Sequence, residues 1–84
     1  MPGLNLGPVC TAELAAIGIT AVEQIRELGW REVCLRWVEA YPSRINLNAF
    51  TGVIGAEHGV HWQRVDPALK QEARRLIQRL RAAR

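Results

Sequence analysis

The sequence predicts an all-α protein, a small orthogonal bundle of five helices. Apolar residues recur at spacings of three and four along most of the chain, and no run alternates apolar and polar residues like a half-buried strand. Apart from Gly52 and Gly55, the glycines and prolines fall between these repeats, where helices end and begin. No heptad pattern persists for three repeats, which favours a bundle over a coiled coil. At 84 residues, the chain is expected to form one domain over residues 1–84.

The first two predicted helices form one unit around a hairpin at Ile17-Gly18-Ile19. The first begins near Gly7-Pro8, because a proline in the first helical turn loses no hydrogen bond. It ends at Gly18, which adopts the left-handed cap conformation without steric cost. The second is predicted to open with a capping box, in which Thr20 and Glu23 bond each other's backbone amides, and to end at Gly29.

A third helix is predicted from an apolar stripe that ends before Pro42. The stripe consists of Trp30, Val33, Cys34, Trp37, Val38 and Tyr41. Asn46 is expected to cap a fourth helix through about residue 57, with Leu47, Phe50 and Ile54 turned inward. Its interior glycines each weaken it by roughly 1 kcal/mol and are best tolerated where another backbone packs close. As a candidate protein-interaction surface, the sequence offers Gly52, Gly55, Gly59 and Tyr41.

The last predicted helix opens with Asp66-Pro67 and is strongly basic. Residues 62–84 hold seven of the eleven basic residues but only two of the eight acidic ones. The core side of this helix is expected to be Leu69, Ala73, Leu76, Ile77 and Leu80. A step of 100° per residue puts Lys70, Arg74 and Arg81 on one flank and Arg75 and Arg79 on the other. Such charge either attracts polyanions or simply solvates a terminal helix.

Three segments in order carry a resemblance to a known family. They are Asn5-Leu6-Gly7-Pro8, Ile17-Gly18-Ile19 and His61-Trp62, with Leu14-Ala15-Ala16, Val22-Glu23, Leu28-Gly29 and Leu47-Asn48 between them. Over about the whole chain, these residues resemble the C-terminal domain of the TfoX (Sxy) family of bacterial regulators of natural competence. The resemblance implies a helix-hairpin-helix, SAM-like fold and a cytoplasmic, non-catalytic role in transcription regulation. The partners it implies are DNA, a transcription factor or RNA polymerase-associated protein, or a second copy in a homodimer.

The resemblance also makes Gly7 a candidate phosphate contact. In DNA-binding helix-hairpin-helix proteins, a glycine-rich turn before a helix presents backbone N–H groups to a phosphate. The corresponding turn here is Asn5-Leu6-Gly7, and Val9 stands where a lysine or polar residue often follows the proline. The turn is therefore equally well interpreted as a packing device. The full set of candidate nucleic-acid contacts is Lys70, Arg74, Arg81, Arg64 and Gly7, with Arg75 and Arg79 in reserve.

Residues for catalysis, metal binding or a cofactor do not form a recognisable pattern. His58 and His61 flank Gly59, which breaks the helical geometry of zinc motifs, so a role in the loop is expected, with Trp62 anchoring it in the core. Cys10 and Cys34 fall in apolar patterns and are expected to be free thiols, which suits a reducing cytoplasm, although a bridge between them stays open. No apolar run is long enough to span a membrane.

Two functions therefore compete: a DNA-contacting regulatory domain, and a protein-interaction module. They differ in geometry. DNA binding is favoured if the basic residues of the last helix share a face with Gly7 and Gly18, whereas opposite faces favour the interaction module.

Overall fold

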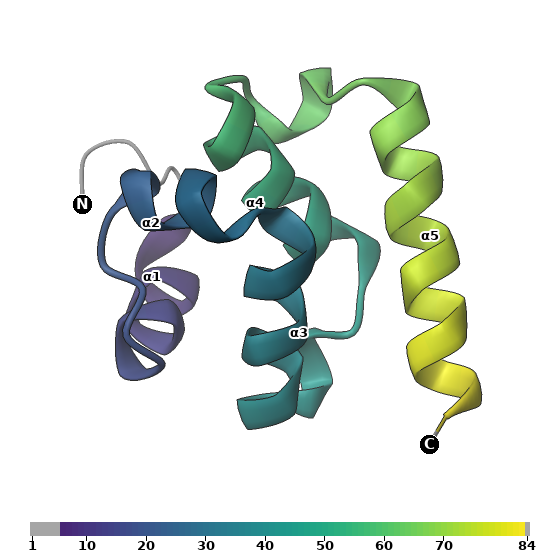
Figure 1. Ribbon diagram of the computed structural model, residues 1–84, viewed down its shortest axis with the longest axis horizontal. Coiled ribbons are helices and arrows are strands. Elements are labelled where there is room, and N and C mark those ends of the chain that lie inside the picture. Colours follow the sequence, from purple (N-terminus) through teal and green to yellow (C-terminus); the bar gives the residue numbers. More distant parts are fainter. Residues whose placement is uncertain (1–5, 84) are drawn as a thin grey trace.

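The computed structural model describes residues 6–83 and confirms the all-α prediction. Its five α-helices are α1 (Gly7–Ala16), α2 (Val22–Leu28), α3 (Trp30–Ala40), α4 (Leu47–His58) and α5 (Pro67–Ala82). Short 3₁₀ turns at η1 (Pro42–Arg44) and η2 (Trp62–Arg64) lie on either side of α4. Within residues 6–83 there is no β-strand. Figure 1 shows α1 and α2 at one side of the molecule, α3 and α4 in the middle, and α5 along the opposite edge.

Helix α4 is the centre of the protein, because α2, α3 and α5 all pack against it. Every residue from Ala49 to Ala56 is buried. A helix that is apolar on all sides is typical of a core position. The sequence prediction of one inward face was therefore too narrow: Phe50 and Ile54 are buried, but Leu47 is only half-buried, and the opposite face is covered as well.

The interior glycines of α4 are packing positions, so the predicted surface of Gly52, Gly55, Gly59 and Tyr41 is wrong for its first two members. Gly52 is buried beneath the side chain of Leu6, and a Cβ on Gly55 would lie 2.6 Å from the carbonyl oxygen of Val60. Only glycine allows the close approach at position 55, where the neighbouring atoms are backbone, whereas the neighbour of Gly52 is the end of a flexible side chain. Gly59 is exposed and ends α4 with φ +70°, and Tyr41 is half-buried.

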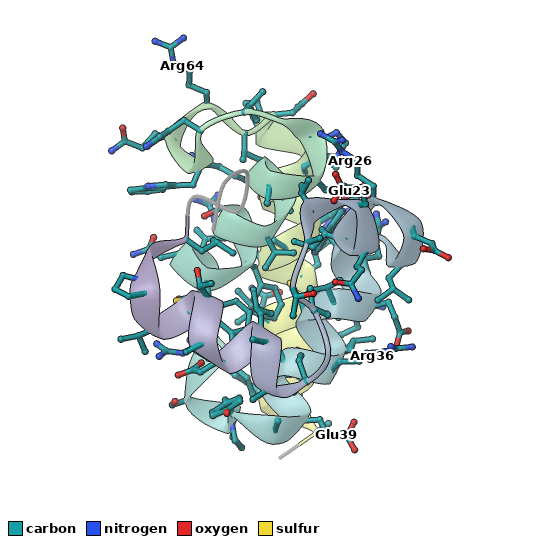
Figure 2. The ribbon with its side chains drawn as sticks, turned by 90° about the vertical axis from the view of Figure 1, so that its left-hand side faces the viewer. Glu23, Arg26, Arg36, Glu39 and Arg64 are labelled. Atoms are coloured by element: carbon teal, nitrogen blue, oxygen red, sulfur yellow. The ribbon has the colours of Figure 1, made fainter. Side chains whose placement is uncertain are left out.

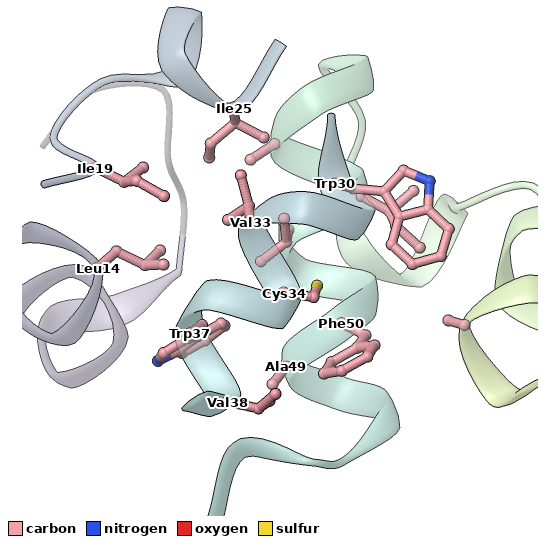
Figure 3. Packing of buried hydrophobic residues seen from close by; sticks show 14 of the residues in the cluster. Leu14, Ile19, Ile25, Trp30, Val33, Cys34, Trp37, Val38, Ala49 and Phe50 are labelled. Atoms are coloured by element: carbon pink, nitrogen blue, oxygen red, sulfur yellow. The ribbon is translucent and has the colours of Figure 1, made fainter. Parts of the chain in front are cut away.

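The α1–α2 hairpin forms where the sequence predicts it. Gly18 has φ +88°, and its N–H donates to the Ala15 carbonyl at 3.0 Å. The Ile19 N–H donates to the Leu14 carbonyl at 2.9 Å, and these two bonds form a Schellman motif. Leu14 and Ile19 are both buried and point into the core from either side of the turn (Figure 3).

The predicted capping box at the start of α2 uses a different residue. The side-chain carbonyl oxygen of Gln24, not the Glu23 carboxylate, accepts from the amides of Thr20 (2.7 Å) and Ala21 (3.0 Å). The Gln24 amide nitrogen also donates to the Gly18 carbonyl at 2.8 Å. Because α2 begins one residue later than expected, the third helical position falls on Gln24, and Glu23 stays exposed.

The apolar stripe predicted on α3 forms one side of the hydrophobic core. Trp30, Val33, Cys34, Trp37 and Val38 are all buried (Figure 3). Tyr41 follows the helix and is half-buried. Two of the three tryptophans are thus core residues and are unavailable for stacking on bases.

Candidate nucleic-acid interface

Helix α5 forms one long edge of the molecule and packs through a single side (Figure 1). Ala73 and Ile77 are buried, and the other predicted core positions Leu69, Leu76 and Leu80 are half-buried. The Asp66 carboxylate caps the helix by accepting from the Ala68 amide at 2.8 Å, as the sequence predicts. The remaining circumference of this sixteen-residue helix faces outward.

Lys70, Arg74 and Arg81 follow one flank of α5. Lys70 is half-buried, and the two arginines are exposed. Arg81 donates to the Ile45 carbonyl at 3.3 Å, so this flank faces the segment between α3 and α4. Within residues 6–83, Lys70 and Arg74 form no ion pair with a carboxylate. Their positive charge is therefore not neutralised locally.

The other flank of α5 borders a shallow groove of about 750 Å³. Arg75 and Arg79 line this groove from α5, and Arg31 lines it from the start of α3. Arg31 forms an ion pair with Glu72 on α5, and its guanidinium lies 4.7 Å from the centre of the Trp30 ring. Arg75 and Arg79, the reserve candidates for nucleic-acid contact, thus lie beside a third arginine, Arg31. Sequence reasoning missed Arg31, because the α3 stripe predicts that it points outward but not that α5 lies beside it.

Gly7 does not belong to this surface. Figure 1 places α1 and α5 on opposite sides of the α3–α4 layer, and in Figure 2, viewed from the α1 side, α5 lies behind that layer. Gly7 is exposed with φ +81°, and Asn5 of the same predicted turn lies outside the described residues. Gly7 therefore does not share a face with Lys70, Arg74 and Arg81. By the geometric criterion stated above, this separation counts for the interaction module, so a DNA site has to rest on α5 without Gly7.

Arg64 lies at the end of the molecule where α5 begins. It belongs to η2 and projects outward there (Figure 2). A pocket of about 520 Å³ is lined by Arg64, His58 and Val60 together with Asp66 at the α5 cap. Arg64 therefore extends the basic region beyond the first turn of α5, next to an acidic residue.

Trp62 is not anchored in the core. The residue is 40% exposed, and it is the backbone of Trp62 that packs over Gly55. Val9 is 61% exposed and Val60 43% exposed. A pocket of about 330 Å³ between the start of α1 and α4 is lined by Leu6, Cys10 and Trp62 among others.

The surroundings of His61 and of the two cysteines indicate roles in packing and capping. The Nδ1 atom of His61 accepts from the Gln63 amide at 3.2 Å, and so caps η2. Across residues 6–83, no three metal-binding side chains come together. Both cysteines are free, and burial raises the pKa of the Cys34 thiol, with the nearby Glu57 charge acting in the same direction. None of the helices in this part of the chain is long and apolar enough to cross a membrane.

The chain was also compared with known protein families. The family described as the TfoX C-terminal domain matches residues 4–76, which include most of α5 but end before Gln78, Arg79 and Arg81. Comparison with curated proteins and with solved structures gave no match.

Proposed function

The chain belongs to the TfoX C-terminal domain family, and on that premise we propose that it is a non-catalytic regulatory domain that contacts the phosphate backbone of DNA through α5. The family suggests a setting in competence and transcription regulation, in the bacterial cytoplasm. The two free cysteines suit that reducing compartment.

The observation that supports DNA contact is the charge of α5. This helix carries five basic residues and one acidic residue, and the acidic residue, Glu72, is paired with Arg31. Clustered cations on an exposed edge attract polyanions over distances beyond contact. The site needs neither Gly7 nor the α1–α2 hairpin.

Fluorescence anisotropy with a labelled 20-base-pair duplex tests this proposal. Affinity should fall steeply between 50 and 200 mM salt, because each neutralised phosphate releases a counterion. Arg74→Gln should weaken binding and reduce the slope of log K against log salt by about 1. Arg36→Gln is the matched control, since Arg36 is exposed and pairs with Glu32 on α3 yet carries the same charge. No binding at 50 mM salt, or equal effects of the two variants, would contradict the proposal.

The separation of α1 from α5 supports a second function, a protein-interaction module that docks on a transcription factor or on its own copy. Its surface would be Val9, Val60 and Trp62, in place of the buried glycines Gly52 and Gly55. Trp62 lines the pocket beside α1 and Val60 lines the pocket beside Arg64, and exposed apolar side chains that form a patch are typical of contact sites. Light scattering at high concentration tests self-association: a two-chain mass that Trp62→Ser returns to one chain supports it, and a one-chain mass removes it.

A further inference from the structure

The outward face of α5 carries a mostly polar stripe, which borders the groove beside Arg31 at Arg75, Gln78 and Ala82. Gln71, Arg75, Gln78 and Ala82 follow the spacing i, i+4, i+7 and i+11, which places them on one face opposite Ala73 and Ile77. All four are exposed. The stripe contains no acidic residue, and the core does not require its side chains.

This stripe lies between basic residues on both sides. Lys70, Arg74 and Arg81 follow one flank, and Arg79 follows the other together with the Arg31–Glu72 ion pair. An α-helix with its side chains is about 10–12 Å across, and the major groove of B-DNA is about 12 Å wide. If the stripe faces the floor of that groove, the two basic flanks face the phosphates of the two strands.

We propose that α5 enters the major groove of duplex DNA and that Gln71, Arg75 and Gln78 read base edges there. This inference rests on the proposed function and adds sequence recognition to backbone contact. A glutamine amide can form two hydrogen bonds with adenine, and an arginine can form two with guanine. From Gln71 to Gln78 the helix rises about 10 Å, which is about three base-pair steps.

The position of α5 favours DNA as the partner. The helix forms an edge of the molecule, so no other helix lies outside it to block its approach (Figure 1). Its net positive charge complements a duplex. The major groove of duplex RNA is too deep and narrow to admit such a helix. A duplex RNA probe therefore distinguishes the two nucleic acids.

The test is selection from a duplex DNA library with a randomised 12-base-pair core, using the full chain. The wild type should enrich a motif of about three to five base pairs that contains adenine and guanine. Gln71→Ala and Gln78→Ala should each reduce the ratio of affinity for the enriched duplex over a scrambled duplex by about tenfold. Gln63→Ala on η2 is the matched control and should leave the ratio unchanged. Circular dichroism checks that the helices persist, which we expect because alanine favours a helix.

The outcomes separate this inference from the proposed function. Salt-dependent binding without an enriched motif, or with a ratio that the stripe variants do not change, overturns base reading and leaves backbone contact standing. Binding to duplex RNA as tight as to duplex DNA also overturns base reading. No binding to any duplex at low salt overturns both proposals.

Discussion

The carboxylate of Glu13 on α1 accepts two hydrogen bonds from the guanidinium of Arg44 on η1, one from Nε at 2.7 Å and one from Nη2 at 2.6 Å. The same carboxylate accepts from the indole nitrogen of the buried Trp37 at 2.8 Å. One acidic side chain thus ties α1 to α3 and to the segment before α4. The Arg44 hydrogen bonds lower the pKa of Glu13, burial opposes them, and the Trp37 bond lowers it further.

Glu13 should therefore make stability depend on pH at the acidic end. A carboxyl group with a lowered pKa in the folded state stabilises the protein fully above its ordinary pKa of 4.5, and this contribution is lost as pH falls through the lowered value. Glu13→Gln should lower the urea midpoint at pH 7, and the gap to the wild type should shrink below pH 4.5. Glu32→Gln breaks an exposed pair with Arg36 and should change little at either pH. A gap that stays constant with pH would contradict this prediction.

Gln24 should matter more than Glu23 for the start of α2. Gln24→Ala removes an acceptor shared by two backbone amides and a donor to Gly18, so we expect it to lower the free energy of unfolding by about 1–2 kcal/mol. Glu23→Gln should change it by less than about 0.5 kcal/mol, because Glu23 is exposed. Urea unfolding of the two variants measures the difference. Equal losses of unfolding free energy in the two variants would indicate that Glu23 caps α2, as the sequence predicts.

Gly55 and Gly52 should respond differently to alanine, although both are buried in α4. Gly55→Ala gains about 1 kcal/mol of helix propensity, but its methyl group meets the rigid backbone of Val60 and Trp62, so a net loss of about 1–3 kcal/mol is expected. In Gly52→Ala the methyl group meets the end of the Leu6 side chain, which can move aside. Thermal unfolding should show a clearly lower Tm for Gly55→Ala only. A similar drop for both would mean that Leu6 is held as firmly as the backbone.

Glu72→Gln should strengthen DNA binding. It removes the one acidic residue of α5 and releases Arg31 for a phosphate. The lost ion pair is exposed, so the free energy of unfolding should fall by no more than about 1 kcal/mol. Anisotropy at 100 mM salt should show a severalfold lower Kd and a steeper salt slope. Unchanged or weaker binding would place the DNA site away from this groove.

Local signals in the sequence predicted the helices well. Hydrogen bonds between near neighbours end or cap the helices at Gly18, Asn46 and Asp66. Such bonds depend on only a few adjacent residues, so the sequence alone predicts them. The Trp30–Val38 stripe likewise predicted which side of α3 is buried.

What the sequence could not predict was how the helices are placed against one another. Burial of Gly52 and Gly55 depends on Leu6 and Val60 packing from elsewhere, and periodicity within α4 carries no such information. The same holds for the candidate site. The flanks of α5 follow from the helical repeat, but the approach of Arg31 and the distance from Gly7 depend on tertiary packing.

Because α5 packs through one side only, the residues that stabilise the fold differ from those proposed to contact DNA. Ala73 and Ile77 hold the helix in place, while positions 71, 75 and 78 make no contribution to the core. Substitutions at those three positions should therefore change the free energy of unfolding very little. An engineer could retarget the domain by rewriting them alone, on a scaffold whose interior stays untouched.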